Sequence, residues 1–324
     1  MFGGIEMEIP VYVITGFLES GKTSFMQETL QDPGFSSENE KTLLLACEEG
    51  MEEYEESILK KFHTVLVPVE EQEDFTTEFL TSCGQQYCPD RVMIEYNGVW
   101  QLQKLLEMEL PKDWVIVQII TLVNAETFDM YLSNMRSIIM EHFSGTDMVI
   151  FNRCTIETPR AAYRRNVRAI NGRAQVYFEA ADEDVEFPEE ELPFDVESSH
   201  IILEDEDFGI WYIDAMDEPQ KYIGKQITFK GMVFKPEKMR KGSFVPGRFA
   251  MTCCADDTTF IGFICKAKAG LEEQVDSLKN RQFVQVTATV AYEFQKDYRG
   301  KGPVLYLDGL KSAEKPREEF VYFM

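Results

Sequence analysis

The sequence predicts an α/β fold with a mostly parallel sheet, followed by a small β-barrel domain. Three observations lead to this prediction. In the first half, short apolar runs alternate with longer amphipathic stretches, which is the pattern of βαβ units. A turn that contains two glycines, residues 16–21, separates the first apolar run from the first expected helix. After an acidic stretch, the pattern changes to five strand-like runs and one helix.

Seven apolar runs predict strands that are buried on both faces of a parallel sheet. They cover residues 11–15, 42–47, 65–69, 91–95, 115–123, 148–151 and 175–178. We expect helices between them: one from Gly21, one near 70–81, one near 125–142 and one after Thr158. Thr158 is predicted as the N-cap of that last helix, with Pro159 as its first residue.

Composition predicts where one domain ends and the next begins. We expect an α/β domain over 1–182, an acidic linker over 183–207 with a strand at 200–203, and a β-rich domain over 208–324. In the last domain, Asp256 and Asp257 are expected to form a hairpin turn, and 270–278 is the only helix that we expect. Strands are predicted at 226–234, 249–254, 260–266, 282–295 and 304–310, which is the element order of a five-stranded OB barrel.

Length and composition also restrict the class of protein. The chain has 324 residues, of which 44% are apolar and 27% are charged, as in ordinary globular domains. The longest apolar stretch, 115–123, contains Gln118 and Thr121 and is too short to cross a bilayer. The first ten residues lack the pattern of a signal peptide. We therefore expect a cytoplasmic protein with no membrane partner and with its seven cysteines reduced.

The net charge of -25 disfavours binding to nucleic acid. Residues 1–220 carry 14 Lys and Arg against 45 Asp and Glu, whereas residues 221–324 carry 18 against 12. This asymmetry indicates two units with different partners, or with each other as partners.

The strongest motif is the run Gly16-Phe17-Leu18-Glu19-Ser20-Gly21-Lys22-Thr23, which fits the P-loop pattern GxxxxGK[ST] and directly follows an apolar strand. The glycines let backbone N–H groups converge on phosphates, and the next helix adds its positive end. Lys22 is expected at the β and γ phosphates, and the Thr23 hydroxyl at Mg²⁺. Residues 16–23, with Ser24, are therefore predicted to bind a nucleoside triphosphate. The Glu19 carboxylate would repel the phosphates unless it points outward, so it either lowers the affinity or has a role of its own.

Together with four further segments, this loop resembles the CobW type of P-loop GTPase, a relative of the UreG and HypB metallochaperones. The resemblance covers about residues 10–180. The four segments are Cys47-Glu48-Glu49-Gly50 at the switch, Met93-Ile94-Glu95-Tyr96-Asn97-Gly98 at Walker B, Phe151-Asn152-Arg153-Cys154-Thr155 at the Asn-Lys-x-Asp motif, and Ile170-Asn171-Gly172-Arg173-Ala174 near the last strand.

The resemblance implies roles for four side chains or backbone groups. Glu95 would hold Mg²⁺, the Gly98 N–H would sense the γ phosphate, Glu48 would be a switch carboxylate near the same ion, and Asn152 would contact the base. The residues alone leave simpler interpretations open. Glu95 could be an ordinary carboxylate at a strand end, and residues 48–56 could be the solvated face of a helix.

Two departures from the family pattern affect function. Thr155 replaces the acid that accepts hydrogen bonds from guanine, so GTP is the expected nucleotide and ATP is the alternative. The family's Cys-x-Cys-Cys metal motif is missing. Cys83 and Cys88 could contribute to a Zn²⁺ site with Cys47 or His63, or they could be unpaired thiols.

The second domain resembles the small domain attached to bacterial membrane proteins of the YcgQ type. Cys253, Cys254 and Cys265 are expected as small residues in its β core. Its aromatic and basic residues could bind single-stranded nucleic acid, but docking of this unit on the acidic first domain is the simpler interpretation. The aromatic residues are Phe229, Phe234, Phe244 and Phe249, and the basic residues are Lys235, Lys238, Arg240, Lys241 and Arg248.

The expected function is that of a slow NTP hydrolase and molecular switch. Lys22, Glu48 and Glu95 are the predicted catalytic residues. The switch would report to the C-terminal unit or to a client protein, and the resemblance implies metal delivery to such a client. One alternative is a P-loop ATPase or small-molecule kinase. Another is a nucleotide-binding adaptor whose barrel binds protein or single-stranded nucleic acid.

Overall fold

The computed structural model describes residues 8–37, 39–48, 50, 52–182, 184–188, 192–236, 239–251, 258–296, 298, 300–317 and 320–322. The chain divides into two compact units, which are described separately. The first comprises Met1–Arg160 and Arg173–Pro188, and the second comprises Ala161–Gly172 and Glu189–Met324.

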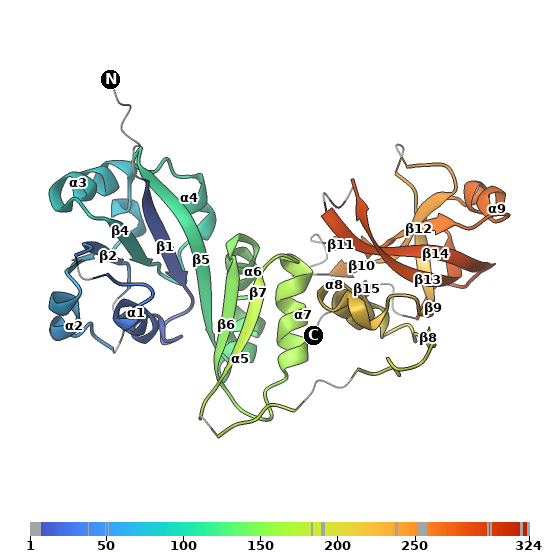
Figure 1. Ribbon diagram of the computed structural model, residues 1–324, viewed down its shortest axis with the longest axis horizontal. Coiled ribbons are helices and arrows are strands. Elements are labelled where there is room, and N and C mark those ends of the chain that lie inside the picture. The colour runs from blue at the N-terminus through green and yellow to red at the C-terminus, as the bar shows by residue number, and fades with distance from the viewer. Residues whose placement is uncertain are drawn as a thin grey trace. The chain divides into compact units, whose positions relative to one another are not determined.

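The first unit contains a seven-stranded sheet in which all strand pairs are parallel, in the order β3-β2-β4-β1-β5-β6-β7 (Figure 1). Its strands are β1 (Ile9–Thr15), β2 (Thr42–Ala46), β3 (Thr64–Pro68), β4 (Arg91–Glu95), β5 (Trp114–Asn124), β6 (Met148–Cys154) and β7 (Gln175–Ala180). All seven predicted strands are confirmed, and the α/β fold class with them.

Parallel pairing brings the carboxyl ends of the central strands to the same edge. In the register of the sheet, Ile14 of β1 pairs with Glu95 of β4, and Thr15 pairs with Thr121 of β5. Ligands of open α/β sheets bind outside this edge. We call it the carboxyl edge.

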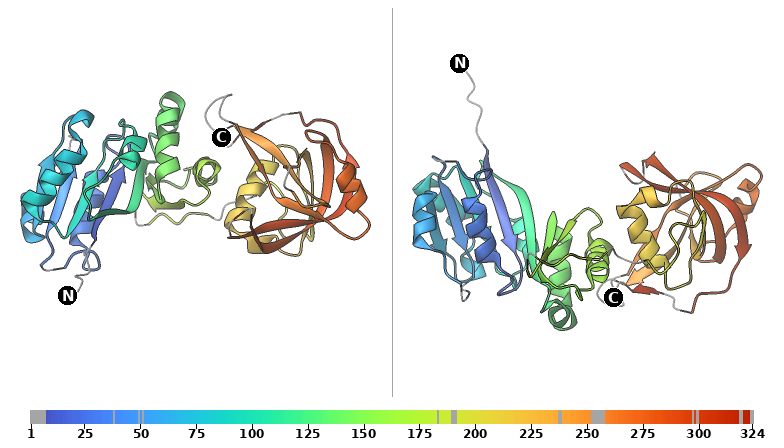
Figure 2. Two further views of the ribbon diagram at one scale, coloured as in Figure 1. Left: turned by 90° about the horizontal axis from the view of Figure 1, so that it is seen from above. Right: turned by 60° about the horizontal axis from the view of Figure 1, so that its bottom comes forward.

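Helices cover both faces of this sheet (Figure 2). On one face, Met26 and Leu30 of α1 pack with Ile14, Leu44 and Met93. The other face is covered by α3 and α4, whose buried residues join the neighbouring strand positions. Burying each such side chain stabilises the fold by about 1.5–3 kcal/mol. The helices are α1 (Lys22–Gln31), α2 (Glu56–Lys61), η1 (Gln72–Asp74), α3 (Thr77–Tyr87), α4 (Leu102–Glu107), α5 (Phe128–Asn134) and α6 (Arg136–Gly145).

Several helix boundaries differ from the prediction. The helix expected near 70–81 begins at Thr77, because the Thr76 hydroxyl accepts a hydrogen bond from the Phe79 N–H and caps it. The helix expected near 125–142 is interrupted at Met135 and forms α5 and α6. The helices α2 and α4 were not predicted, since six residues are too few to give a clear helical period.

The helix expected after Thr158 is α7 (Arg160–Ile170), most of which belongs to the second unit. The prediction that Thr158 caps it is wrong. The Thr158 hydroxyl instead accepts a hydrogen bond from the backbone N–H of Thr155, 2.8 Å away, and stabilises the preceding turn.

In the second unit, five strands close into a barrel in the order β9-β10-β12-β14-β13 and back to β9. The pair β12–β14 is parallel, and α9 (Glu272–Ser277) connects β12 to β13, which is the topology of an OB barrel. The OB-like prediction is thus confirmed. The strands of this unit are β8 (His200–Ile202), β9 (Gln226–Phe234), β10 (Ser243–Met251), β11 (Thr258–Gly262), β12 (Ile264–Ala267), β13 (Phe283–Gln295), β14 (Gly300–Ser312) and β15 (Phe320–Tyr322).

Two strands of the barrel differ from the prediction. β10 begins six residues before Phe249, and the run expected as one strand over 260–266 is divided at Phe263 into β11 and β12. The predicted turn at Asp256 and Asp257 lies outside the described residues, as do Cys253, Cys254 and Lys238. Within the stretch expected as a linker, β8 pairs with β9.

The prediction of a single helix in this unit is wrong. The helix α8 (Phe208–Asp217) is also present, followed by η2 (Pro219–Lys221). Trp211 of α8 is buried and packs against Phe229 and Phe263. Phe208, Trp211 and Tyr212 share one face of α8, but Ile210 and Ile213 make the other side apolar as well. The helix therefore has no clear amphipathic stripe, and its period is hard to recognise from sequence.

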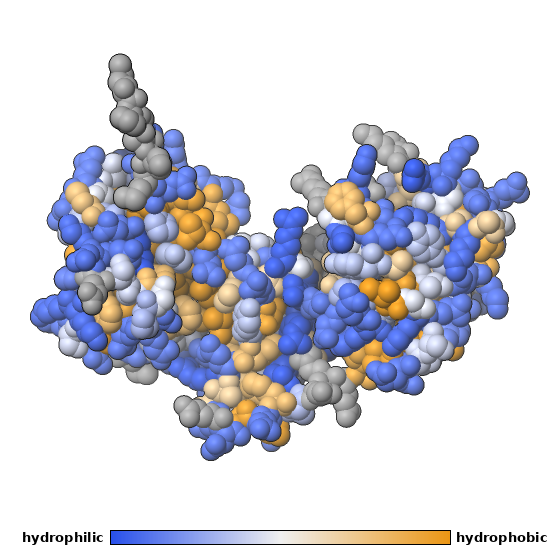
Figure 3. Space-filling view, viewed as in Figure 1, coloured by the Kyte–Doolittle hydropathy of each residue, from blue (hydrophilic) through white to orange (hydrophobic). Residues whose placement is uncertain are grey.

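No helix among the described residues is long and apolar enough to span a membrane. Apolar side chains reach the surface of the first unit near β5 and α4, on the face shown in Figure 3. The exposed apolar residues of these two elements are Val115, Val117 and Leu106, which are 38%, 51% and 40% exposed.

Candidate nucleotide-binding site

The P-loop lies at the carboxyl edge between β1 and α1, and its shape requires glycine at both ends. Gly16 has φ 139°, and a Cβ atom there would lie 2.2 Å from the Leu122 carbonyl oxygen. Gly21 has φ 90°, and a Cβ atom there would lie 3.0 Å from the Asn152 side-chain nitrogen. Both residues are in a backbone region that side chains disfavour. The loop is therefore fitted closely between β5 and the end of β6.

The segment after β4 packs directly on this loop. A Cβ atom on Gly98 would lie 2.2 Å from the Gly16 carbonyl oxygen, so only glycine can occupy this position without displacing the P-loop. The contact places the Gly98 backbone beside the expected phosphate site. Its N–H as a sensor of the γ phosphate stays a prediction.

Lys22, the P-loop lysine, is buried in this loop. Its ammonium group donates hydrogen bonds to the carbonyl oxygens of Gly16, at 2.7 Å, and Phe17, at 3.0 Å. It also donates to the Glu48 carboxylate. The side chains of Lys22 and Glu48 are 2% and 11% exposed, so this ion pair is largely shielded from water.

Thr23 and Glu95 are adjacent, as a magnesium site requires. The Thr23 hydroxyl donates a 2.8 Å hydrogen bond to one carboxylate oxygen of Glu95, and the Tyr54 hydroxyl donates a 2.6 Å bond to the other. Burial raises the pKa of Glu95, against the effect of these two hydrogen bonds. A hydroxyl and a carboxylate are hard oxygen ligands, which suit Mg²⁺. The two residues therefore fit the ion that the sequence predicts.

The acidic segment from Glu48 to Tyr54 follows β2 and is bound to the site at several points. Glu48 contacts Lys22, Glu52 accepts a hydrogen bond from Ser24, and Tyr54 contacts Glu95. These contacts do not fit the open alternative that residues 48–56 are a solvated helix face. Glu49 lies outside the described residues.

Leu18 and Glu19 of the P-loop line a cavity of about 180 Å³ together with Lys22, Glu48 and Glu95. Glu19 has φ 61° and is exposed, and the direction of its carboxylate stays a prediction. Phe17 stacks on Tyr131 of α5, with ring centroids 4.3 Å apart. Leu18 is 46% exposed.

On the other side of the P-loop, a cavity of about 670 Å³ opens beside Asn152 and Arg153. The Asn152 side-chain amide donates to the Ser20 carbonyl at 2.8 Å, and the Arg153 guanidinium donates to the Glu19 carbonyl at 2.9 Å. The cavity extends along α1 from Gly21 and Ser24. Its position, at the carboxyl edge and next to the phosphate loop, suits a nucleoside.

Residues 10–178, more than half of the chain, match the nucleotide-binding domain of the CobW/HypB/UreG family. The chain belongs to this family. Residues 178–323 match the DUF1980 C-terminal domain, and both expected resemblances are thereby confirmed.

One curated relative and two solved structures illustrate these matches. The chain is 22% identical over 122 residues to the UPF0703 protein YcgQ of Bacillus subtilis (strain 168), an alignment that covers 38% of the chain and 41% of that protein. It is similar to the Zn(II)-bound YjiA GTPase from E. coli, with 17% identity, 69% of this chain and 72% of that chain covered, and a TM-score of 0.41. It is also similar to the hydrogenase maturation factor HypB from Archaeoglobus fulgidus, with 14% identity, coverage of 53% and 81%, and a TM-score of 0.37.

This CobW-family chain differs from the family motif at the site expected for the nucleotide base. Thr155 is exposed and does not line the cavity, whereas Glu179, Ala180 and Ala181 at the end of β7 do. Sequence reasoning missed these residues, although the carboxyl end of the last strand was available as a signal. The segment 170–174 leads into the opposite, amino end of β7 and is therefore distant from the carboxyl edge.

The structure gives no support to a transition-metal site at Cys83 and Cys88. Cys83 lies on the buried face of α3, whereas Cys88 is exposed at the end of that helix. Among the described residues, no group of three or more His, Cys, Asp or Glu side chains could hold a metal ion. The described cysteines, which are Cys47, Cys83, Cys88, Cys154 and Cys265, are free thiols.

A buried histidine behind the P-loop was not predicted. Nδ1 of His142, on α6, lies 2.7 Å from the Thr15 hydroxyl, at the residue before Gly16. Burial, together with the charge of Lys22, lowers the pKa of His142 to about 4. His142 therefore supports the loop as a neutral imidazole.

Proposed function

We propose that this chain is a magnesium-dependent GTP hydrolase and that the segment Glu48–Tyr54 is its switch. The observation that carries the proposal is the position of Lys22. Its ammonium group is held among the P-loop carbonyls and is paired with Glu48, a carboxylate that takes the place a phosphate oxygen would need.

The proposed chemistry is charge stabilisation at the phosphates. The N–H groups of residues 16–23 and the first turn of α1 bind the phosphate oxygens, and Lys22 neutralises charge between the β and γ phosphates. Thr23 and Glu95 would hold Mg²⁺, which would supply further charge neutralisation at the phosphates. Tyr54 orients Glu95 through its hydrogen bond.

The proposed switch follows from competition for Lys22. A γ phosphate and the Glu48 carboxylate are both anions, so they cannot share the same ammonium group without repulsion. Nucleotide binding then releases Glu48 from Lys22 and makes it available to orient the attacking water. The contacts of Glu52 and Tyr54 carry this movement along the segment.

We infer a client protein as the partner, in the cytoplasm. The match to the CobW/HypB/UreG family supports this inference, because the resemblance implies relatives that act as metallochaperones for another protein. Among the described residues, Cys83 and Cys88 do not form a cargo site by themselves.

The test is GTP binding and phosphate release by the full chain, with Mg²⁺ and with EDTA. We expect Lys22→Ala to weaken binding by about 100-fold, because it removes a charge-assisted contact and leaves Glu48 facing the phosphates. Glu48→Gln should strengthen binding by about 10-fold and slow phosphate release, because it removes the competing charge and the carboxylate that orients water. Lys60→Ala, at an exposed lysine of α2, is the matched control.

Two results would contradict the proposal. One is GTP affinity that is equal in wild type and Lys22→Ala. The other is phosphate release that continues at the same rate in EDTA.

A further inference from the structure

The cavity beside Asn152 raises the question of which base it reads, because the acid of the family's guanine motif is replaced by Thr155. This inference rests on the proposed function and deepens it. We infer that Glu179 at the end of β7 is the base-reading acid and that it makes the site specific for guanine.

Thr155 cannot supply this contact. Its backbone N–H donates to Thr158, and its hydroxyl accepts a hydrogen bond from the Glu157 N–H. Both groups are thus engaged in an exposed turn. Thr155 does not line the cavity, and its side chain lacks a carboxylate.

A β-bulge brings Glu179 beside Asn152. In the pairing of β6 with β7, Phe151 pairs with Phe178, and the next pair is Cys154 with Ala180. Two residues of β6, Asn152 and Arg153, therefore lie opposite one residue of β7, Glu179. Bulges of this kind change the direction of side chains near functional sites. Here the bulge places the amide of Asn152 and the carboxylate of Glu179 at the same end of the cavity.

The cavity connects this acid to the phosphate site. Gly21 and Ser24, at the start of α1, line it together with Asn152 and Glu179. Its volume of about 670 Å³ lies within the range of about 300–1,000 Å³ that is usual for small-molecule sites. A nucleoside in this cavity would have its phosphates at the P-loop and its base at β7.

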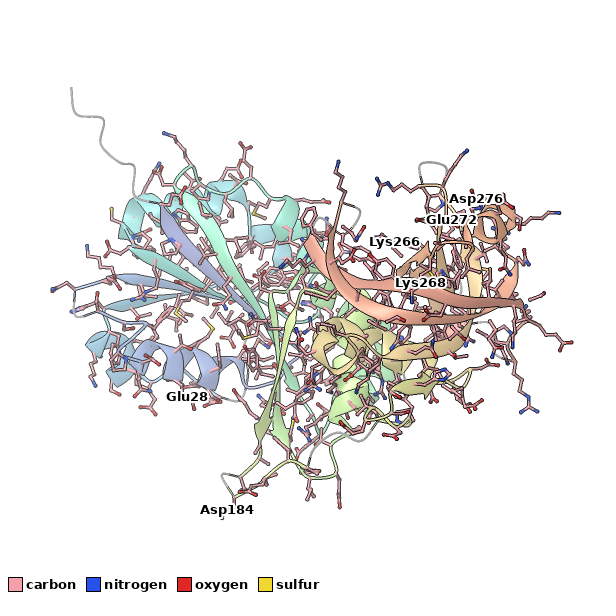
Figure 4. The ribbon with its side chains drawn as sticks, turned by 45° about the vertical axis from the view of Figure 1, so that its right-hand side comes forward. Glu28, Asp184, Lys266, Lys268, Glu272 and Asp276 are labelled. Carbon is pink, nitrogen blue, oxygen red and sulfur yellow. The ribbon has the colours of Figure 1, made fainter. Side chains whose placement is uncertain are left out.

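No lysine or arginine is among the groups that shift the pKa of Glu179, which burial and the negative charge of Glu28 raise. The Arg153 guanidinium lines the same cavity but donates to the Glu19 carbonyl. Glu28 projects from α1, as labelled in Figure 4, and lines the same cavity. A ligand that offers hydrogen-bond donors at this point would therefore be favoured over one that offers acceptors.

Guanine offers two such donors. Its N1–H and its N2 amino group lie side by side and match the two oxygens of a carboxylate. Adenine presents an unprotonated N1 at the corresponding edge, and this acceptor would be repelled by the carboxylate. Xanthine keeps N1–H but has a carbonyl oxygen at C2, which matches an amide instead.

The test uses this difference. We would measure the affinity of the full chain for GTP, ATP and XTP in Mg²⁺, for wild type and Glu179→Gln. Wild type should prefer GTP to ATP by at least about 30-fold, the discrimination expected of a bidentate contact. Glu179→Gln should lose about 30-fold in affinity for GTP and gain by a similar factor for XTP. A gain of binding cannot arise from misfolding.

Two further variants separate Glu179 from its neighbours. Glu28→Gln removes the other carboxylate of the cavity and should change the GTP to XTP ratio less than threefold. Thr155→Asp restores the family acid and should not improve GTP binding. A switch to XTP in Glu28→Gln, or a large gain of GTP affinity in Thr155→Asp, would assign base reading to that position and overturn the inference.

The outcomes also distinguish the inference from the proposed function. If wild type binds no nucleoside triphosphate, the proposed function is wrong. If wild type binds GTP and ATP equally, or if Glu179→Gln keeps the wild-type preference for GTP, the nucleotide site stands but the role of Glu179 is wrong.

Discussion

The two units place their charged groups differently. In the first unit, Lys22 and Glu48 form an ion pair whose side chains are only 2% and 11% exposed. In the second unit, an ion pair on the outside of the barrel joins Lys268, directly after β12, to Asp308 of β14, and their side chains are 45% and 21% exposed. Lys268 is labelled on the barrel in Figure 4.

This difference separates binding from folding. Burying an ion pair costs solvation free energy, and the attraction between the two charges hardly offsets this cost. The buried pair of the first unit therefore adds little to folding, and ligand binding explains its position better. Surface pairs cost little and contribute little. The barrel depends instead on an apolar interior, in which Trp211, Phe229 and Phe244 are buried.

The largest expected effect compares one glycine from each unit. Gly16→Ala should destabilise the first unit by about 3 kcal/mol and abolish nucleotide binding, because it combines a disfavoured φ with a clash against the Leu122 carbonyl. Gly270 also has a positive φ, of 91°, but a Cβ atom at this position would meet no other atom within 4 Å. Gly270→Ala is therefore the comparison variant. It should destabilise the barrel by about 1 kcal/mol.

Tryptophan fluorescence in urea measures this pair of variants unit by unit. Trp100 and Trp114 report on the first unit, and Trp211 reports on the second. Equal destabilisation by the two variants would show that the P-loop is not closely fitted against β5.

The next effect is a pH dependence confined to the first unit. The pKa of His142 is about 4 in the fold, against 6.5 as its ordinary value. The neutral imidazole therefore contributes stability that is present above pH 6.5 and is lost as the pH falls toward 4. Between pH 7 and pH 5 the loss should be about 2 kcal/mol.

The measurement is urea unfolding at several pH values in a Trp211→Phe background, where only the first unit is observed. His142→Gln should remove this part of the pH slope. His200→Gln, at an exposed histidine of β8, is the control and should leave the slope unchanged. A slope that persists in His142→Gln would assign the pH dependence to groups other than His142. Glu95 is not among them, because its raised pKa gives a slope of the opposite sign.

The smallest effect is expected at the barrel surface. Lys268→Ala removes the bond to Asp308 and should lower the free energy of unfolding of the second unit by only a few tenths of a kcal/mol. GTP binding should not change. The urea transition followed by Trp211 fluorescence measures this free energy of unfolding. A decrease of more than about 2 kcal/mol would show that this surface ion pair stabilises the barrel as strongly as a buried ion pair.

Much of the fold could be predicted from local patterns. The seven strands of the first unit are continuous apolar runs, and a strand that is buried on both faces needs little else to be recognised. Errors occurred where a tertiary contact decides the structure. The helix α8, for example, is held by the packing of Trp211 against Phe229 and Phe263, and no local pattern indicates these two partners.

The sequence by itself determined the P-loop, because glycine, lysine and threonine at fixed spacing after a strand leave few other structures open. It also indicated Glu48 and Glu95 as candidates, through the family resemblance. Only the tertiary structure placed Tyr54 on Glu95, His142 behind Thr15, and Glu179 opposite Asn152. Tyr54 and Glu95 are 41 residues apart in the sequence, and Thr15 and His142 are 127 residues apart. Asn152 and Glu179 lie on the paired strands β6 and β7. Contacts between such distant residues depend on sheet register and helix packing rather than on local sequence.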